Sequence, residues 1–232
     1  MPTIRETLEG YGKLLARVDR WYSGCLDRYP EHITCRSGCS DCCRGLFDIT
    51  LLDAWHLRAG FKQLSAPVRK EAVRKAKRRT ESLAVFWPEL APPYLLNHRP
   101  DEQWEELMPD EDDTPCPLVG KDGRCLAYDH RPMTCRLHGL PLVDLDGEIF
   151  HDEWCTRNFV GSAPLEIEAL RGEFRNLFRD ELTLFREFAV ELLGVPLSEL
   201  DTFIPLALMV DYERFDWRAW WRQASAEIKR GD

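Results

Sequence analysis

The spacing of the cysteines constrains this chain more than any other feature of its sequence. Residues 35–45 read CRSGCSDCCRG, with four cysteines in the pattern C-x3-C-x2-C-C, and four more cysteines follow between residues 116 and 155. A stretch with so many cysteines and two glycines has neither the helical nor the strand period of apolar residues. We therefore expect two loops built around something that the cysteines bind. The candidate ligands are Cys35, Cys39, Cys42, Cys43, Cys116, Cys125, Cys135 and Cys155.

The size of the chain indicates that these cysteines serve chemistry and not stability. A chain of 232 residues buries roughly 70–75% of its unfolded surface and needs no cross-links to fold. The N-terminus carries Arg5, Glu6 and Glu9 where a secretory signal needs an apolar core. We expect a cytoplasmic protein, in which thiols stay reduced and clustered cysteines are metal ligands or catalytic groups.

The apolar pattern predicts a mainly α fold. Helices are expected over residues 4–29, 51–59, 66–86, 164–193 and 203–210. Gly60 is expected to end the second of these helices. Asp146-Gly147 predicts a tight turn in a β-hairpin near residues 141–150, and residues 45–50 are a further candidate strand.

We thus expect helices packed around a cysteine-rich metal-binding loop region with one small β-hairpin. Residues 1–160 would form a helical cysteine-cluster domain, and residues 161–232 a C-terminal helical extension packed on the same core. The ninth cysteine, Cys25, lies on the apolar face of the first helix and is expected to be a core residue.

Thiolate-only ligation is typical of zinc and of iron–sulfur clusters. The adjacent pair Cys42-Cys43 is informative because neighbouring side chains tend to point apart. Either one of the two is a ligand and the other a nearby thiol, or the eight thiolates serve two centres. His130 and His138 are possible ligands as well, although hydrogen-bonding neighbours are the expected role for them.

The net charge of the chain bears both on the partners it can bind and on the side chains expected beside a metal centre. The net charge of −9 argues against binding to nucleic acid or to an anionic membrane, and no apolar window is long enough to span a bilayer. A protein partner stays possible. A metal–thiolate centre is itself anionic, so Arg131 and Arg136, which bracket Cys135, are expected to lie beside it. The basic run at residues 69–79 and the acidic stretch at 101–113 are expected to pair with each other.

These motifs resemble a known family. CRSGCSDCC, CPLVGKDGRCLAYDHRPMTCR and EWCTRN are similar to the YkgJ-type cysteine-cluster family, the CxxCxxCC zinc- or iron-chelating domain, over about residues 35–155. The first gap holds three residues here, where two are often seen. The matching positions are Cys35, Cys39, Cys42, Cys43, Cys116, Cys125, Tyr128, Arg131, Pro132, Cys135, Arg136 and Cys155.

The resemblance implies a protein that binds zinc or iron, often as an iron–sulfur protein, and most members have no assigned activity. We expect the eight cysteines to hold the metal, with [4Fe–4S] favoured over zinc and with Tyr128, Arg131 and Arg136 next to the ligands. A redox protein or a component of an oxidoreductase is the function expected first.

Other functions stay open. One alternative is a structural zinc-binding interaction module without catalysis. Another is an iron–sulfur-dependent methylase, as in the related flagellin lysine N-methylase. A third is a radical S-adenosylmethionine enzyme, whose cysteine spacing Cys35, Cys39 and Cys42 share; here, however, Asp41 stands where that family usually has an aromatic residue. No nucleotide-binding or hydrolase motif is present, so the sequence assigns no reaction.

Overall fold

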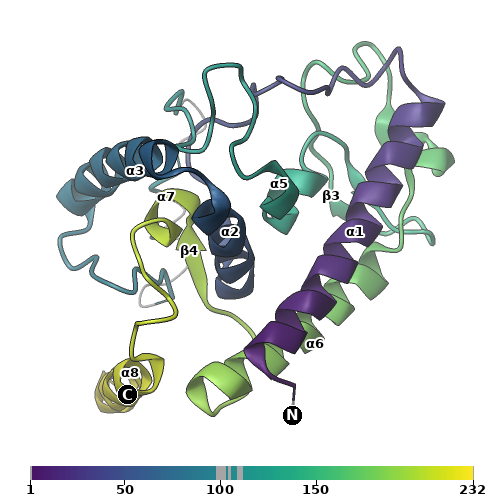
Figure 1. The fold of residues 1–232 in the computed structure, drawn as a ribbon. Helices are drawn as coiled ribbons and strands as arrows, with labels where there is room; N and C mark the ends of the chain where they lie inside the picture. The colour runs from purple at the N-terminus through teal and green to yellow at the C-terminus, as the bar shows by residue number, and fades with distance from the viewer. Residues whose placement is uncertain (1, 98–102, 104–105, 109–111, 232) are drawn as a thin grey trace.

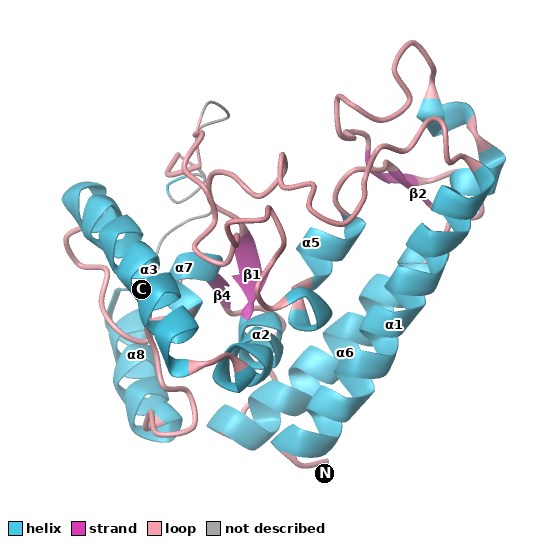
Figure 2. Ribbon diagram, turned by 45° about the horizontal axis from the view of Figure 1, so that its top comes forward, coloured by secondary structure: helices cyan, strands magenta, loops and turns pink. Residues whose placement is uncertain are grey.

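The computed structural model describes residues 2–97, 103, 106–108 and 112–231 and confirms a mainly α fold (Figures 1 and 2). The helices are α1 (Ile4–Arg28), α2 (Leu51–Gln63), α3 (Ala66–Phe86), α5 (Met133–Leu137), α6 (Phe174–Leu193), α7 (Ile204–Ala207) and α8 (Trp217–Gly231). The strands are β1 (Asp48–Thr50), β2 (Leu142–Val143), β3 (Ile149–His151) and β4 (Asp201–Phe203). Among the described residues, no helix is both long and apolar enough to cross a membrane.

Helices α1 and α6 lie side by side and run in opposite directions (Figures 1 and 2). Thr3 caps α1 through a capping box with Glu6, as the sequence predicts. Arg17 near the middle of α1 donates from Nη1 to Asp180 Oδ2 of α6 at 2.6 Å. This pair of helices forms one wall of the molecule, and the loop after α1 crosses one end of the molecule toward α2 (Figure 1).

A buried polar network holds α5, which carries Cys135, against the core. The Asp53 carboxylate of α2 accepts hydrogen bonds from the Tyr11 hydroxyl at 2.6 Å and from the Met133 backbone N–H at 2.9 Å. Tyr11 also donates to Glu181 of α6 at 3.4 Å. Burial raises the pKa of Asp53 and of Glu181, because low-polarity surroundings disfavour the charged carboxylates.

Two small antiparallel sheets are present in the described chain. The predicted hairpin is confirmed as β2–β3. The second sheet pairs β1 with β4, with Ile49 opposite Thr202. The candidate strand at residues 45–50 is confirmed as β1. Its partner β4 ends at Phe203, the first residue of the helix predicted over residues 203–210. That helix is shorter than predicted at both ends. Phe203 still belongs to β4, and α7 ends at Ala207.

Gly60 does not end α2, which continues to Gln63. A Cβ added at Gly60 would lie 2.4 Å from Cγ of His130. The glycine is therefore needed for close packing of the His130 ring on the helix, and the prediction of a helix stop was wrong.

The long helix predicted from residue 164 begins only at Phe174 and is preceded by two 3₁₀ turns, Pro164–Glu166 and Glu168–Leu170. Tertiary contacts redirect this segment. Leu170 O accepts from the Trp21 indole N–H at 2.9 Å. The backbone N–H of Gly172 donates to Val143 O at 3.0 Å.

The basic helix α3 does pair with part of the acidic stretch. Arg79 forms an ion pair with Asp112 and lies within 3.4 Å of the Thr114 hydroxyl. Arg74 pairs within the helix with Glu71 at 2.5 Å. Most of the acidic stretch from 101 to 111 lies outside the described residues.

Candidate metal centre

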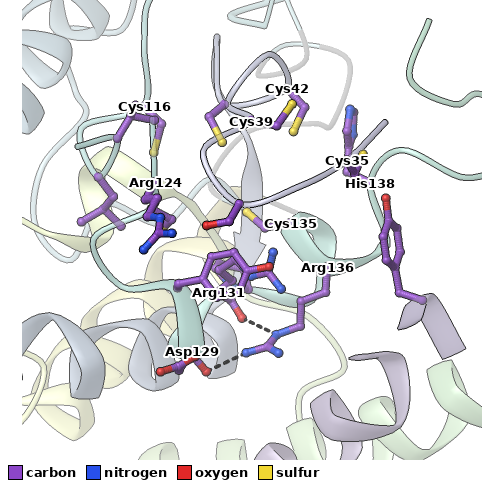
Figure 3. Close-up of a pocket in the computed structure, with 18 of the residues that line it drawn as sticks. Cys35, Cys39, Cys42, Cys116, Arg124, Asp129, Arg131, Cys135, Arg136 and His138 are labelled. Atoms are coloured by element: carbon purple, nitrogen blue, oxygen red, sulfur yellow. Dashed lines mark hydrogen bonds between the residues drawn. The ribbon is translucent and has the colours of Figure 1, made fainter. Parts of the chain in front are cut away.

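A cavity of about 520 Å³ lies between the cysteine loops, α1 and α5. Figure 3 shows Cys39, Cys42 and Cys116 on one side of it, with Cys135 and the guanidinium groups of Arg131 and Arg136 on the other. Seven of the eight predicted ligands line this cavity: Cys35, Cys39, Cys42, Cys43, Cys116, Cys125 and Cys135. Cys155 is not among the lining residues.

The first cysteine loop folds as successive tight turns. Cys39 N–H donates to Arg36 O at 2.9 Å, and Cys43 N–H donates to Ser40 O at 3.0 Å. At its tip the loop meets the second cysteine loop so closely that a Cβ at Gly123 would lie 2.3 Å from Gly38 O. Gly123 has φ +78°, which glycine adopts without strain. The two sequence segments are thus brought together by backbone contact and not by the thiols alone.

Asn158 organises one set of thiols, which we call the outer thiol group (Cys35, Cys39 and Cys155). Its side-chain N–H donates to Cys35 Sγ at 3.5 Å and to Gly139 O at 2.8 Å. Its backbone N–H donates to Cys155 O at 2.8 Å. One buried residue therefore fixes the loops that carry Cys35 and Cys155.

Further contacts join the two loops that carry the outer thiols. Burial raises the pKa of Cys155, and the charges of Cys35 and Cys39 raise it further. An ion pair between Asp41 and Arg157 joins the same two loops. A Cβ added at Gly139 would lie 3.3 Å from the Tyr22 hydroxyl and 3.5 Å from Cys35 Sγ. Burial, followed by the neighbouring Cys35, raises the pKa of Tyr22.

Three other thiols pack against the main hydrophobic core, and we call them the inner thiol group (Cys116, Cys125 and Cys135). Cys125 forms an isolated antiparallel β-bridge with Val119, and Cys135 lies on α5. Burial raises the pKa of Cys116 to about 12 and raises the pKa of Cys125 and Cys135 as well. A bound metal reverses this effect, because a coordinating thiol loses its proton outright.

The vicinal pair lies between the two groups. A hydrogen bond between the thiols of Cys42 and Cys43 is the largest cause that raises the pKa of Cys42, and burial follows. Both residues line the cavity. The carbonyl of Cys43 accepts from the N–H of Cys116 at 2.9 Å, which ties the pair to the inner thiol group.

The arginines that bracket Cys135 have different surroundings. Arg136 is buried and donates to Arg131 O at 2.9 Å and to Asp129 O at 2.7 Å (Figure 3), and it forms an ion pair with Asp19. The guanidinium of Arg131 stacks 3.7 Å from the centre of the Tyr128 ring. Arg136 thus holds the backbone of the second cysteine loop, whereas Arg131 covers the cavity together with Tyr128.

Of His130, His138 and Cys25, only His138 lines the cavity. His130 packs on Gly60 with its ring centre 5.0 Å from that of His56. Cys25 is 0% exposed and packs with Ile33 and neighbouring apolar residues. The prediction that Cys25 is a core residue is confirmed.

Sequence reasoning missed Asn158, Tyr22 and Asp19. Asn158 is one of the few buried polar side chains in the described structure, but it lies far from Cys35 in sequence. Tyr22 lies in the regular apolar pattern of α1, which gave no sign of a thiol partner. Only the fold reveals their roles.

The donor set fits a thiolate-bound metal. Thiols from several loops face one cavity, and zinc and iron–sulfur clusters are the groups that take thiolates alone. In the described part of the chain, no three Cys, His, Asp or Glu side chains are already gathered tightly enough around one point to hold an ion.

A helical scaffold with a thiol-lined cavity defines a metal-binding protein of the cysteine-cluster class. A family model described as "CxxCxxCC: Putative zinc- or iron-chelating domain" matches residues 34–156, more than half of the chain. The chain belongs to this family. Searches of curated proteins and of solved structures gave no significant match.

Proposed function

We propose that this protein holds an iron–sulfur centre, [4Fe–4S] in type, through its clustered cysteines. The observation that carries the proposal is the convergence of seven thiols from distant parts of the sequence on one cavity of about 520 Å³. Cysteine thiolates are the protein ligands that hold iron–sulfur clusters. The eighth candidate, Cys155, lies beside Cys35 through Asn158.

Charge around the cavity supports an anionic thiolate-bound group. Arg36, Arg124 and Arg131 line the cavity in a protein whose net charge is −9. Positive side chains near such a centre offset its charge and help to set its reduction potential. When bound, the cluster would supply electron transfer. The chain's own residues supply the thiolates, the positive surroundings and the packing that limits water.

Zinc is the second candidate because the family description includes it and because thiolate-only sites suit it equally well. In that case the site would be structural, and the surface would serve a protein partner. Both candidates require reduced thiols. All nine cysteines are free, and we propose a reducing compartment such as the cytoplasm.

Anaerobic purification followed by iron, zinc and acid-labile sulfide analysis tests the proposal. We expect a brown protein with iron and sulfide in equal amounts and with broad visible absorption. A colourless protein with stoichiometric zinc and no sulfide would refute the iron–sulfur proposal in favour of zinc. Cys135→Ala should lower the metal content, whereas the matched control Cys25→Ala should leave it unchanged.

A further inference from the structure

We propose that the eight thiols form two neighbouring metal centres, one built on the outer thiol group and one on the inner, with the vicinal pair Cys42-Cys43 completing both. This inference rests on the proposed metal binding and concerns how the ligands are divided. The division follows from which segments of backbone position each thiol.

The outer thiol group is positioned by the segment after Gly139 and by Asn158. The carbonyl of Gly139 accepts from the N–H of Cys155 at 3.3 Å, and a Cβ at Gly139 would lie 3.5 Å from Cys35 Sγ. Cys35 packs with the small apolar cluster around Cys25, not with the main core.

The inner thiol group is positioned by different contacts. The N–H of Leu126, next to Cys125, donates at 2.8 Å to the carbonyl of Leu118, two residues after Cys116. The Lys75 ammonium of α3 donates to Val119 O at 3.0 Å. All three inner thiols pack against the main core. The two groups thus belong to separate packing units that meet at the cavity.

The vicinal pair is the part that both groups share. Cys42 and Cys43 line the same cavity as Cys35 and Cys39 of the outer group and Cys116 and Cys125 of the inner group, and the Cys43 carbonyl accepts from the Cys116 N–H at 2.9 Å. Because both thiols of the pair line the cavity where the two groups meet, each can complete the shell of one centre. Three outer thiols, three inner thiols and one from the pair for each gives four ligands per centre, the number that zinc and iron–sulfur clusters take.

The two centres should differ in how readily they exchange metal. All eight candidate thiols are partly buried, but the three inner thiols pack against the main hydrophobic core, whereas the outer thiols have the exposed neighbours Arg36, Ser37 and Arg157. Buried, fully packed sites are typical of structural metals, whereas reactive sites keep an accessible position. We assign a structural role to the inner centre, and exchange or reaction to the outer one.

Matched variants test the division. We compare metal per chain in the wild type, Cys35→Ser, Cys125→Ser and the double variant, with Cys25→Ser as control. Two centres predict that each single variant keeps about half of the wild-type metal, that the double variant keeps almost none, and that the control keeps all of it. Loss of all metal in either single variant, or full retention in either, overturns the division. A wild type without metal refutes the proposed function as well.

Release of metal from the wild type provides a measurement that needs no variant. With excess chelator under anaerobic conditions, we expect a fast and a slow phase of equal amplitude. Cys125→Ser should retain only the fast phase and Cys35→Ser only the slow one. A single phase that releases all of the metal would contradict two centres of different accessibility.

Discussion

Asn158 offers the sharpest test of how the fold positions the outer thiols. The residue is only 1% exposed, and its side chain hydrogen-bonds Thr34, Cys35 and Gly139. Its carbonyl oxygen accepts from the backbone N–H of Thr34 at 2.8 Å and from the Thr34 hydroxyl at 3.1 Å. Its N–H group donates to Gly139 O at 2.8 Å and to Cys35 Sγ at 3.5 Å.

The cost of Asn158→Ala follows from the groups that it leaves unpaired. The Thr34 N–H loses its partner, and the Gly139 carbonyl keeps only the longer bond from the Cys155 N–H at 3.3 Å. Each unsatisfied buried group costs about 1–3 kcal/mol. The bonds to the Thr34 hydroxyl and to the Cys35 thiol are weaker and add little. We expect a loss of about 3 kcal/mol, which lowers the Tm by about 6–12 °C in a chain of this size.

Asn158→Asp is the matched variant. It keeps the acceptor for Thr34 but cannot donate to Gly139 O or to Cys35, and it adds a negative charge beside the thiols. Urea and thermal unfolding of the metal-free protein measure the stability, and metal analysis measures the outer centre. We expect reduced metal content in both variants. An Asn158→Ala protein within about 0.5 kcal/mol of the wild type, with full metal content, would refute this account of the loop.

Three other predictions concern the frame around the cavity. Arg136→Met should destabilise the protein by about 3 kcal/mol in urea unfolding, because two backbone carbonyls lose their donor, whereas Asp19 keeps its ion pair with Arg131. No loss of stability would show that these hydrogen bonds are dispensable. Gly60→Ala should lower the Tm even though alanine favours helices by about 1 kcal/mol, because the new methyl group overlaps the His130 ring; a raised Tm would contradict this. Burial and the neighbouring Asp53 carboxylate raise the pKa of Glu181 from 4.5 to about 8. Between these two pH values the folded state keeps a proton that the unfolded state has lost. The free energy of unfolding should therefore fall as the pH rises from about 4.5 to 8. Glu181→Gln should flatten that slope and be more stable than the wild type at pH 8 by roughly 3 kcal/mol, and equal slopes in the two proteins would exclude this role.

Local sequence signals predicted the elements whose structure is decided locally. The capping box at Thr3 and the apolar period of α1 gave that helix correctly, and Pro67 in the first turn marked the start of α3. The Asp146-Gly147 turn gave the hairpin. In each case the residues that determine the conformation lie within a few positions of one another.

The errors occur where distant contacts decide. Gly60 was interpreted as a helix stop, but it is a point of close approach for a ring that lies far along the chain. The pairing of β1 with β4 joins residues near 49 and 202, which no local pattern reveals. The same holds for the site. Spacing identified the thiols, but the contacts of Cys35 with Asn158 and Tyr22 depend on how the ends of the chain fold back together.

The coordination of the metal by these thiols is the central claim, and X-ray absorption at the metal edge of the anaerobically purified protein tests it most directly. The account predicts a first shell of sulfur alone, near the 2.3 Å that is typical of zinc–thiolate bonds. This shell should persist in the Cys25→Ala control. A first shell of nitrogen or oxygen at about 2.0–2.2 Å, or a protein that carries no metal, would contradict the account.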